Sequence, residues 1–275
     1  MVPRLTDGDA RTIRMKLEYD GTAFSGWQVQ GTSPIRTVQG ALEQVLSLVL
    51  QERIVVGVAG RTDAGVHAAG QVASFVTTSA LPLHRIARAL AGLLPPDVAA
   101  RELAVVPEGF HARFSAVERR YVYRLLDAPR PLFARRAWWP WMRFDADALT
   151  AAYRPLLGEH DFAAFAARDP TKRPPQHGRC RVTRLAFVPW EHGVQLEAHA
   201  NRFLYHMVRN LVGSATWVTR GLIAPEDLPR ILAEGKRSAA GPTAPAHGLT
   251  LEDVVYKDGF APIGEHVDGW GRSLS

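Results

Sequence analysis

One short stretch of the sequence places a carboxylate and a guanidinium within a single turn. Residues 59–75 read AGRTDAGVHAAGQVASF, and one residue separates Arg61 from Asp63. Gly60 and Gly65 allow the backbone to bend sharply there. A carboxylate beside a fixed positive charge remains ionised well below neutral pH. The pattern predicts either a turn held by a local salt bridge or a charged aspartate able to act as nucleophile or general base.

Arg209, in the stretch RFLYHMVRN towards the other end of the chain, is a second candidate. We predict that it is the ion-pair partner of Asp63, which requires the two halves of the chain to meet. The histidines that could take part in acid–base chemistry are His67, His111 and His206, and each is more typical of a structural position. No pair of histidines has the spacing of metal ligands beside a carboxylate, so no metal site is expected.

The composition is that of an ordinary globular protein that can bury a sizeable core. The chain has 275 residues, of which 47% are hydrophobic and 22% charged. No apolar run reaches the roughly 18 residues of a transmembrane helix, and the N-terminus lacks the apolar core of a signal peptide. The phosphate-binding motifs GxxxxGK[ST] and GxGxxG are absent, so we do not expect an ATPase or a dehydrogenase.

The single cysteine, Cys180, cannot form an intramolecular disulfide, and we expect the protein to be cytoplasmic. Its neighbours Arg179 and Arg181 favour a lowered pKa for the thiol. Because no plausible base lies nearby, a catalytic thiol is not expected.

Positive charge is concentrated in two segments. Residues 111–143 carry eight arginines against two acidic residues, and residues 168–184 carry six basic residues against one acidic residue. The whole chain has a net charge of only +6, so the remainder is acidic. Segment 111–143 also holds seven aromatic residues, a combination suited to phosphate contact and base stacking. The pattern favours a polyanionic partner, and the alternative is a solvated arginine face above core aromatics.

Hydrophobic periodicity predicts the elements that would hold the aspartate turn. In the first half, strands are expected over 12–19, 54–59, 71–77 and 98–106, with helices opening at residues 34–37 and at Pro82. The order is βαββαβ, with Asp63 between the second and third strands. In the second half, strands are expected over 119–126, 181–188, 194–200 and 249–256, with helices after Asp145, over 204–218 and near 225–234.

We therefore predict an α+β fold, with two ferredoxin-like or RRM-like βαββαβ halves joined into one mixed, mainly antiparallel sheet with helices on one side. The predicted divisions are a tail over 1–11, a first half over 12–110, a second half over 111–257 and a loosely held tail over 258–275. The loop over 21–37 is either an ordinary crossover or an RNA-contacting loop. Residues 240–248, AGPTAPAHG, are expected to be a small-residue linker.

Five motifs, in order, resemble those of the TruA family of tRNA pseudouridine synthases, and the resemblance extends through nearly the whole chain. They are EYDGTAFSGWQVQ, AGRTDAGVHAAGQVASF, FHARFSAVERRYVYRL, NRFLYHMVRNLVGS and AHGLTLEDVVY. The resemblance implies an isomerase that converts uridine to pseudouridine at positions 38, 39 and 40 of the tRNA anticodon stem-loop, with base flipping. It also implies a homodimer, one tRNA spanning both subunits, and no metal or cofactor.

The resemblance further implies roles for single residues. Asp63 is the implied catalytic aspartate, paired with Arg209, and Tyr121 is implied to stack on the target base. Leu249 is implied to pack beneath that base, while Arg61 moves into the gap left by the flipped nucleotide.

Two chemical routes stay open. The carboxylate of Asp63 either adds covalently to the uridine or removes the C2′ proton to give a glycal. Tyr121 could accept the C5 proton, although a phenol with a pKa of about 10 is a weak base. His67, which lies within the aspartate motif, is expected to help bind the substrate.

Two other functions are compatible with the same residues. One is a tandem RRM-like RNA-binding module without chemistry, in which Asp63 is only a turn residue; the RRM aromatic signature is absent from both halves. The other is a hydrolytic N-glycosidase that uses the same carboxylate and releases free uracil.

Overall fold

The computed structural model describes residues 10–29, 35–167 and 178–274 of the chain. The fold is α+β, as predicted, and its strand pairs are mainly antiparallel. The chain forms two compact units. The first unit contains residues 1–117 and 251–275, and the second contains residues 118–250.

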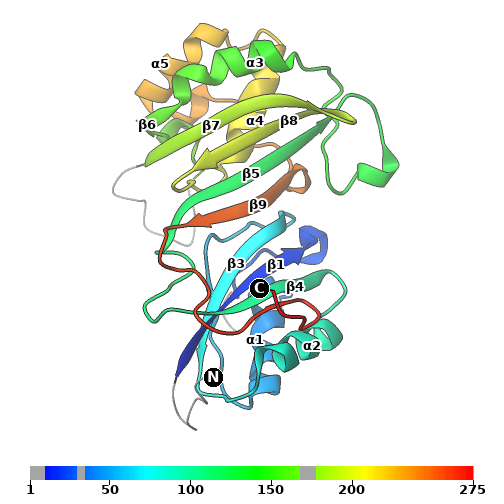
Figure 1. Ribbon diagram of the computed structural model, residues 1–275. Coiled ribbons are helices and arrows are strands. Elements are labelled where there is room, and N and C mark those ends of the chain that lie inside the picture. Colours follow the sequence, from blue (N-terminus) through cyan, green and yellow to red (C-terminus); the bar gives the residue numbers. More distant parts are fainter. Residues whose placement is uncertain (1–9, 30–34, 168–177, 275) are drawn as a thin grey trace. The chain divides into compact units, whose positions relative to one another are not determined.

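The first unit has the predicted βαββαβ order (Figure 1). Its elements are β1 (Arg11–Tyr19), α1 (Val38–Leu50), β2 (Gly57–Val58), β3 (His67–Thr77), α2 (Leu83–Leu93), β4 (Val98–Val106) and β10 (His266–Asp268). The strand order is β10-β4-β1-β3, and β2 pairs with β3. All these pairs are antiparallel. The four strands of the repeat lie in the order β4-β1-β3-β2, which is the order expected of a ferredoxin-like sheet.

Sequence periodicity accounts for this unit. Alternate residues of β1, including Ile13, Met15 and Leu17, are fully buried, while their neighbours are partly exposed. This is the pattern of a strand with one face on the core. Helix α1 begins where the Thr37 hydroxyl accepts a hydrogen bond from the Gly40 amide at 3.2 Å, an N-cap that satisfies one of the helix's free donors.

The second unit carries the sheet order β5-β8-β7-β6, again antiparallel. Its elements are β5 (Ala116–Leu126), α3 (Ala146–Tyr153), β6 (Gly158–Asp161), β7 (Arg179–Trp190), β8 (Gly193–Ala200), α4 (Met207–Thr219) and α5 (Leu228–Glu234). The Tyr153 ring meets Phe187 of β7 edge-on at 5.2 Å, and its hydroxyl donates to the Leu211 carbonyl of α4 at 2.7 Å. Helices α3 and α4 therefore cover the same face of this sheet. Strand β9 (Leu249–Tyr256) then leads back into the first unit.

The structure corrects several sequence predictions. The strand expected over 54–59 is only the two residues of β2, and the helix expected from residue 204 begins at Met207, because His206 has left-handed backbone angles with φ of 60°. Strands β6 and β10 were not predicted, because short polar strands such as GEHD carry no alternating apolar signal. The tail over 258–275 is not loosely held throughout, since β10 pairs with β4 and buries Val267.

The division of the chain into residues 12–110 and 111–257 follows the repeat of elements and stays a prediction. No helix among the described residues is long and apolar enough to cross a membrane.

Candidate catalytic site

The aspartate turn lies between β2 and β3 in the first unit. The Val66 amide donates to the Asp63 carbonyl at 3.1 Å, and Gly65 takes a positive φ of 78°, which closes a tight turn that requires glycine at this position. Exposure alternates along the approach, with Arg61 exposed, Thr62 buried and Asp63 half-buried. The two charged side chains are thus accessible while the residue between them is anchored inside.

A buried hydrogen-bond network anchors this turn from behind. The hydroxyl of Tyr19 lies 2.7 Å from the hydroxyl of Thr62, and Gln71 donates through Nε2 to both the Tyr19 hydroxyl at 3.2 Å and the Gly60 carbonyl at 2.8 Å. All three side chains are at least 94% buried. The network therefore fixes the backbone on both sides of Arg61, and it holds the residue directly before Asp63.

Burial raises the pKa of Tyr19 to about 12, while the hydrogen bonds with Thr62 and Gln71 lower it. The Tyr19 phenol therefore stays neutral throughout the physiological range. It can donate one hydrogen bond and accept another, as this network requires.

The loop after β1 supports the same turn. The Trp27 amide donates to the Thr62 carbonyl at 3.0 Å, and the Gly65 amide donates to the Phe24 carbonyl at 3.4 Å. Gly26 has a φ of 93°, and a Cβ there would lie 2.8 Å from the Thr62 carbonyl oxygen, so only glycine fits. The described part of the 21–37 loop is therefore a support for the aspartate turn, and residues 30–34 lie outside the described residues.

His67 lies at the start of β3 and is 5% exposed. Its Nδ1 accepts a hydrogen bond from the Gly21 amide at 3.1 Å. The Asp20 carboxylate lies 3.3 Å from the same nitrogen. The ring thus connects the end of β1 to the segment after the turn, and its expected contact with substrate stays a prediction.

The second unit carries the other predicted site residues. Tyr121 lies on β5 with 8% exposure, and its ring meets Phe203 edge-on at 5.2 Å. Arg209 is half-buried on α4, where its Nε donates to the Ala244 carbonyl at 2.7 Å. The Ala244 amide in turn donates to the Arg209 carbonyl at 3.1 Å, so residue 244 is bound to both the backbone and the side chain of Arg209.

The predicted linker 240–248 is in fact bound closely to α4. Asn210, which is fully buried, accepts hydrogen bonds from Thr243 at 2.6 Å and from Arg237 at 2.9 Å. The Gly241 amide donates to the Ser214 hydroxyl at 2.9 Å. A Cβ on Gly213 would overlap the backbone carbonyl of Pro242, which explains the small residues on both sides of this contact.

The same segment leads to Leu249. The Tyr123 hydroxyl donates to the Pro245 carbonyl at 2.8 Å, and its ring lies directly against Gly248. Burial raises the pKa of Tyr123 well above its ordinary value, while the positive charge of Arg209 lowers it. Tyr123 therefore places the start of β9, including the buried Leu249, near the helix that carries Arg209.

The structure thus holds the predicted residues in two groups. Asp63, Arg61 and His67 belong to one unit, whereas Tyr121, Arg209 and Leu249 belong to the other. The pairing of Asp63 with Arg209 joins the units and stays a prediction. Sequence reasoning missed the supporting residues Tyr19, Gln71 and Asn210. The one signal for Gln71 was a polar residue at an inward position of an otherwise apolar strand.

The prediction of a lowered pKa for Cys180 is wrong. Burial raises the pKa of this thiol to about 11, the charge of Asp161 raises it as well, and the charge of Arg202 lowers it. The exposed side chains of Arg179 and Arg181 are not the groups that act on the thiol. Of the basic segment 168–184, residues 168–177 lie outside the described residues. Within the described residues, no group of three or more His, Cys, Asp or Glu could hold a metal ion.

Comparison with known proteins gives one consistent result. A family model described as tRNA pseudouridine synthase matches residues 16–115 and 152–257. A protein of Chloroflexus aurantiacus named tRNA pseudouridine synthase A is 45% identical over 258 residues, covering 91% of this chain and 90% of its own length. Proteins of the same name from Chromobacterium violaceum and Myxococcus xanthus are 40% and 41% identical, covering 90% of this chain and 94% and 92% of their own.

Proposed function

Because the chain belongs to the family of tRNA pseudouridine synthases, we propose that it converts uridine to pseudouridine at positions 38, 39 and 40 of the tRNA anticodon stem-loop. It is an isomerase that acts on tRNA. The proposal of these positions and of a catalytic aspartate rests on the aspartate turn. In this turn the half-buried Asp63 lies two residues after the exposed Arg61. Buried hydrogen bonds of Thr62 and Gln71 anchor the backbone of the turn.

The reaction needs a group that acts on the sugar. The N1–C1′ bond of uridine breaks, the base turns over, a C5–C1′ bond forms, the C5 proton leaves, and N1 gains a proton. In one route the Asp63 carboxylate bonds to C1′ as the base leaves, and C5 later displaces it. In the other route Asp63 removes the C2′ proton as N1–C1′ breaks, and the proton returns when C5 adds.

Base flipping sets the roles of the neighbouring residues. A base within a stem must leave the stack to turn over, at a cost of roughly a few kcal/mol. The exposed Arg61 is free to fill the gap in the stem, and stacking of the extruded base on Tyr121 would offset about 1–3 kcal/mol. Arg209 would hold Asp63 in its charged form, and Leu249 would form the floor beneath the base.

The proposal is tested with a tRNA transcript carrying tritium at C5 of its uridines. Pseudouridine formation exchanges that tritium for a solvent proton, so release into water measures turnover without any added cofactor. We expect release with the wild-type protein, confined to positions 38, 39 and 40 when single uridines are replaced. Asp63→Asn should abolish release while tRNA affinity changes by less than about threefold, because the amide keeps the shape but not the charge.

Asp258→Asn is the matched control, because Asp258 is an exposed aspartate of the same unit. Its activity should equal that of the wild type. Equal loss of binding and product in Asp63→Asn would instead support an RNA-binding module in which this residue only shapes the turn. Release of free uracil from the transcript would identify an N-glycosidase and would refute the isomerase chemistry.

We also propose that the protein works in the cytoplasm as a homodimer, with one tRNA spanning both subunits. The homodimer and the shared tRNA rest on the family resemblance of the five motifs, and the cytoplasm rests on the single cysteine. Sedimentation of the purified protein at micromolar concentration should give the mass of two chains, and a monomer that retains full activity would refute it.

A further inference from the structure

Trp141 has a backbone and an exposure that folding alone does not explain. Its φ is 62°, in the left-handed region that is strongly disfavoured for bulky residues. Its side chain is 79% exposed, so it contributes little to the core of the second unit. Left-handed angles cost roughly 1–2 kcal/mol for a residue with a Cβ. A glycine would remove that strain, so the presence of tryptophan points to a role outside stability.

A second tryptophan fixes the orientation of this ring. Trp139 lies against Trp141 with ring centroids 3.8 Å apart and an angle of 29° between the rings, which is a stacked arrangement. One face of the Trp141 ring is therefore covered by Trp139. Because the residue is so exposed, the opposite face is presented to solvent. A flat, preoriented aromatic face is the element on which unpaired nucleotide bases stack.

Exposed arginines lie close to this pair along the chain. Arg130, Arg135 and Arg143 are all exposed, and in the part of the chain that the structure describes none of them forms an ion pair. Arg143 follows Trp141 by two residues, so the two side chains belong to one short stretch. Cations without anionic partners beside an aromatic face match the phosphates and bases of a nucleic acid.

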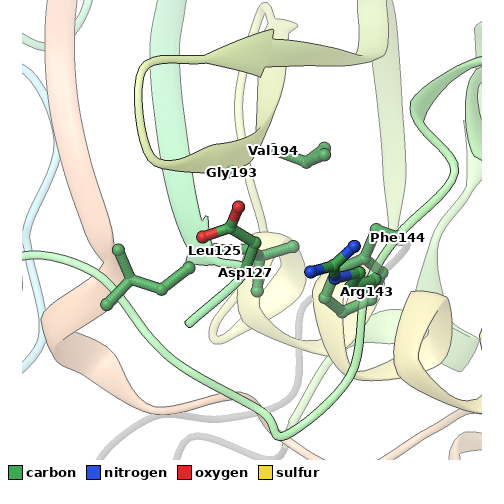
Figure 2. A pocket seen from close by; sticks show the side chains of 7 residues that line it. Leu125, Asp127, Arg143, Phe144, Gly193 and Val194 are labelled. Carbon is green, nitrogen blue, oxygen red and sulfur yellow. The ribbon is translucent and has the colours of Figure 1, made fainter. Parts of the chain in front are cut away.

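A cavity adjoins the same stretch. It has a volume of about 240 Å³ and is lined by Leu125, Leu126, Asp127, Arg143, Phe144, Gly193 and Val194. Figure 2 shows the Asp127 carboxylate and the Arg143 guanidinium at this cavity, with the Phe144 ring beside Arg143. The volume is below the roughly 300–1,000 Å³ of sites for drug-sized ligands, so a single planar base is a suitable size. The Asp127 carboxylate would repel a phosphate, but it can accept hydrogen bonds from the N–H groups of a base.

We propose that residues 127–144 form a second RNA-binding surface, on which an unpaired base of the tRNA stacks on Trp141 while exposed arginines contact phosphates. The inference rests on the proposed function only in naming tRNA as the RNA. A second copy of this chain is the less suitable occupant. In a symmetric contact the unpaired arginines of both copies would face one another, and like charges repel.

The inference is tested by the affinity of Trp141→Ala for an unmodified tRNA transcript, measured by filter binding without turnover. Alanine keeps the left-handed strain of the wild type, so the change removes the ring and little else. Loss of one stacking contact of about 1–3 kcal/mol predicts affinity weakened roughly 5- to 150-fold. The control is Trp270→Ala, because Trp270 is 69% exposed but lies in the other unit. It should bind within twofold of the wild type.

Two further measurements separate the outcomes. Changing Arg135 and Arg143 to alanine should reduce the slope of log affinity against log salt by roughly 0.7–0.9 for each lost contact. A photoreactive benzoylphenylalanine in place of Trp141 should crosslink to the transcript. Wild-type affinity for tRNA in Trp141→Ala would overturn the proposal. So would a crosslink from position 141 to a second protein chain, together with loss of the dimer in Trp141→Ala. Failure of the wild type to release tritium would refute the proposed function and leave this binding result intact.

Discussion

Tyr19→Phe is the most informative test of how the fold serves the site. The substitution removes the Tyr19 hydroxyl, which shares a hydrogen bond with the Thr62 hydroxyl and accepts another from Gln71. Both partners are buried, so each loses a partner that water cannot easily replace. Leaving buried polar groups unsatisfied costs about 1–3 kcal/mol, and we expect the free energy of unfolding to fall by that amount.

Turnover should fall as well as stability. Because Thr62 and Gln71 hold the backbone on both sides of Arg61, loss of the hydroxyl allows the segment carrying Asp63 to shift. A displacement of about 1 Å at a reacting group costs on the order of 100-fold in rate. We expect kcat for tritium release to fall about 10- to 100-fold, with KM for tRNA within threefold, because the RNA-contacting arginines are untouched.

Tyr153→Phe is the matched control for this experiment. It also removes one hydroxyl from a fully buried tyrosine, here from the Leu211 carbonyl, but in the second unit. Chemical denaturation should give similar losses of stability for the two variants. Only Tyr19→Phe should reduce kcat. Equal stability losses with wild-type kcat in both variants would refute the view that the buried network positions the aspartate turn.

The other predictions concern the thiol of Cys180, the close contact of Gly213 with the backbone of Pro242, and Arg209. Since burial raises the pKa of Cys180 from 9.0 to about 11, Ellman's reagent should not label the folded protein at pH 8 but should label it in guanidinium chloride. The neutral thiol is the favoured folded form, so its contribution to stability is complete below pH 9 and is lost as the pH rises from 9 to 11. Gly213→Ala should lower the free energy of unfolding by about 1–3 kcal/mol, because its Cβ would overlap a backbone carbonyl, whereas Gly92→Ala, in open space on α2, should raise it by about 0.5–1 kcal/mol. Arg209→Ala should lower kcat roughly 10- to 150-fold with tRNA affinity within threefold, as expected for loss of a charge-assisted contact to Asp63, and wild-type turnover would disprove that pairing.

Much of the local structure follows directly from the sequence. Alternation over residues 12–19 predicted β1, and the N-caps Thr37 and Asp145 are observed with side-chain bonds of 3.2 Å and 2.9 Å. The glycine-dependent turn at Asp63 was also predicted, and Gly65 has the positive φ it needs. These features depend on residues within a few positions of one another, where periodicity, capping and backbone freedom act directly.

The supports of the site depended on the tertiary structure. Tyr19 lies 43 residues from Thr62 and 52 residues from Gln71, and these side chains meet only because β1 pairs antiparallel with β3. Segment 240–248 resembled a linker because its small residues carry no periodic signal. Those small residues are what allow its backbone to approach α4 so closely. The sequence by itself therefore determined the family, the turn and most of the regular elements. The buried hydrogen bonds that hold Asp63 and Arg209 in place were decided only by packing, since each joins groups that no local pattern relates.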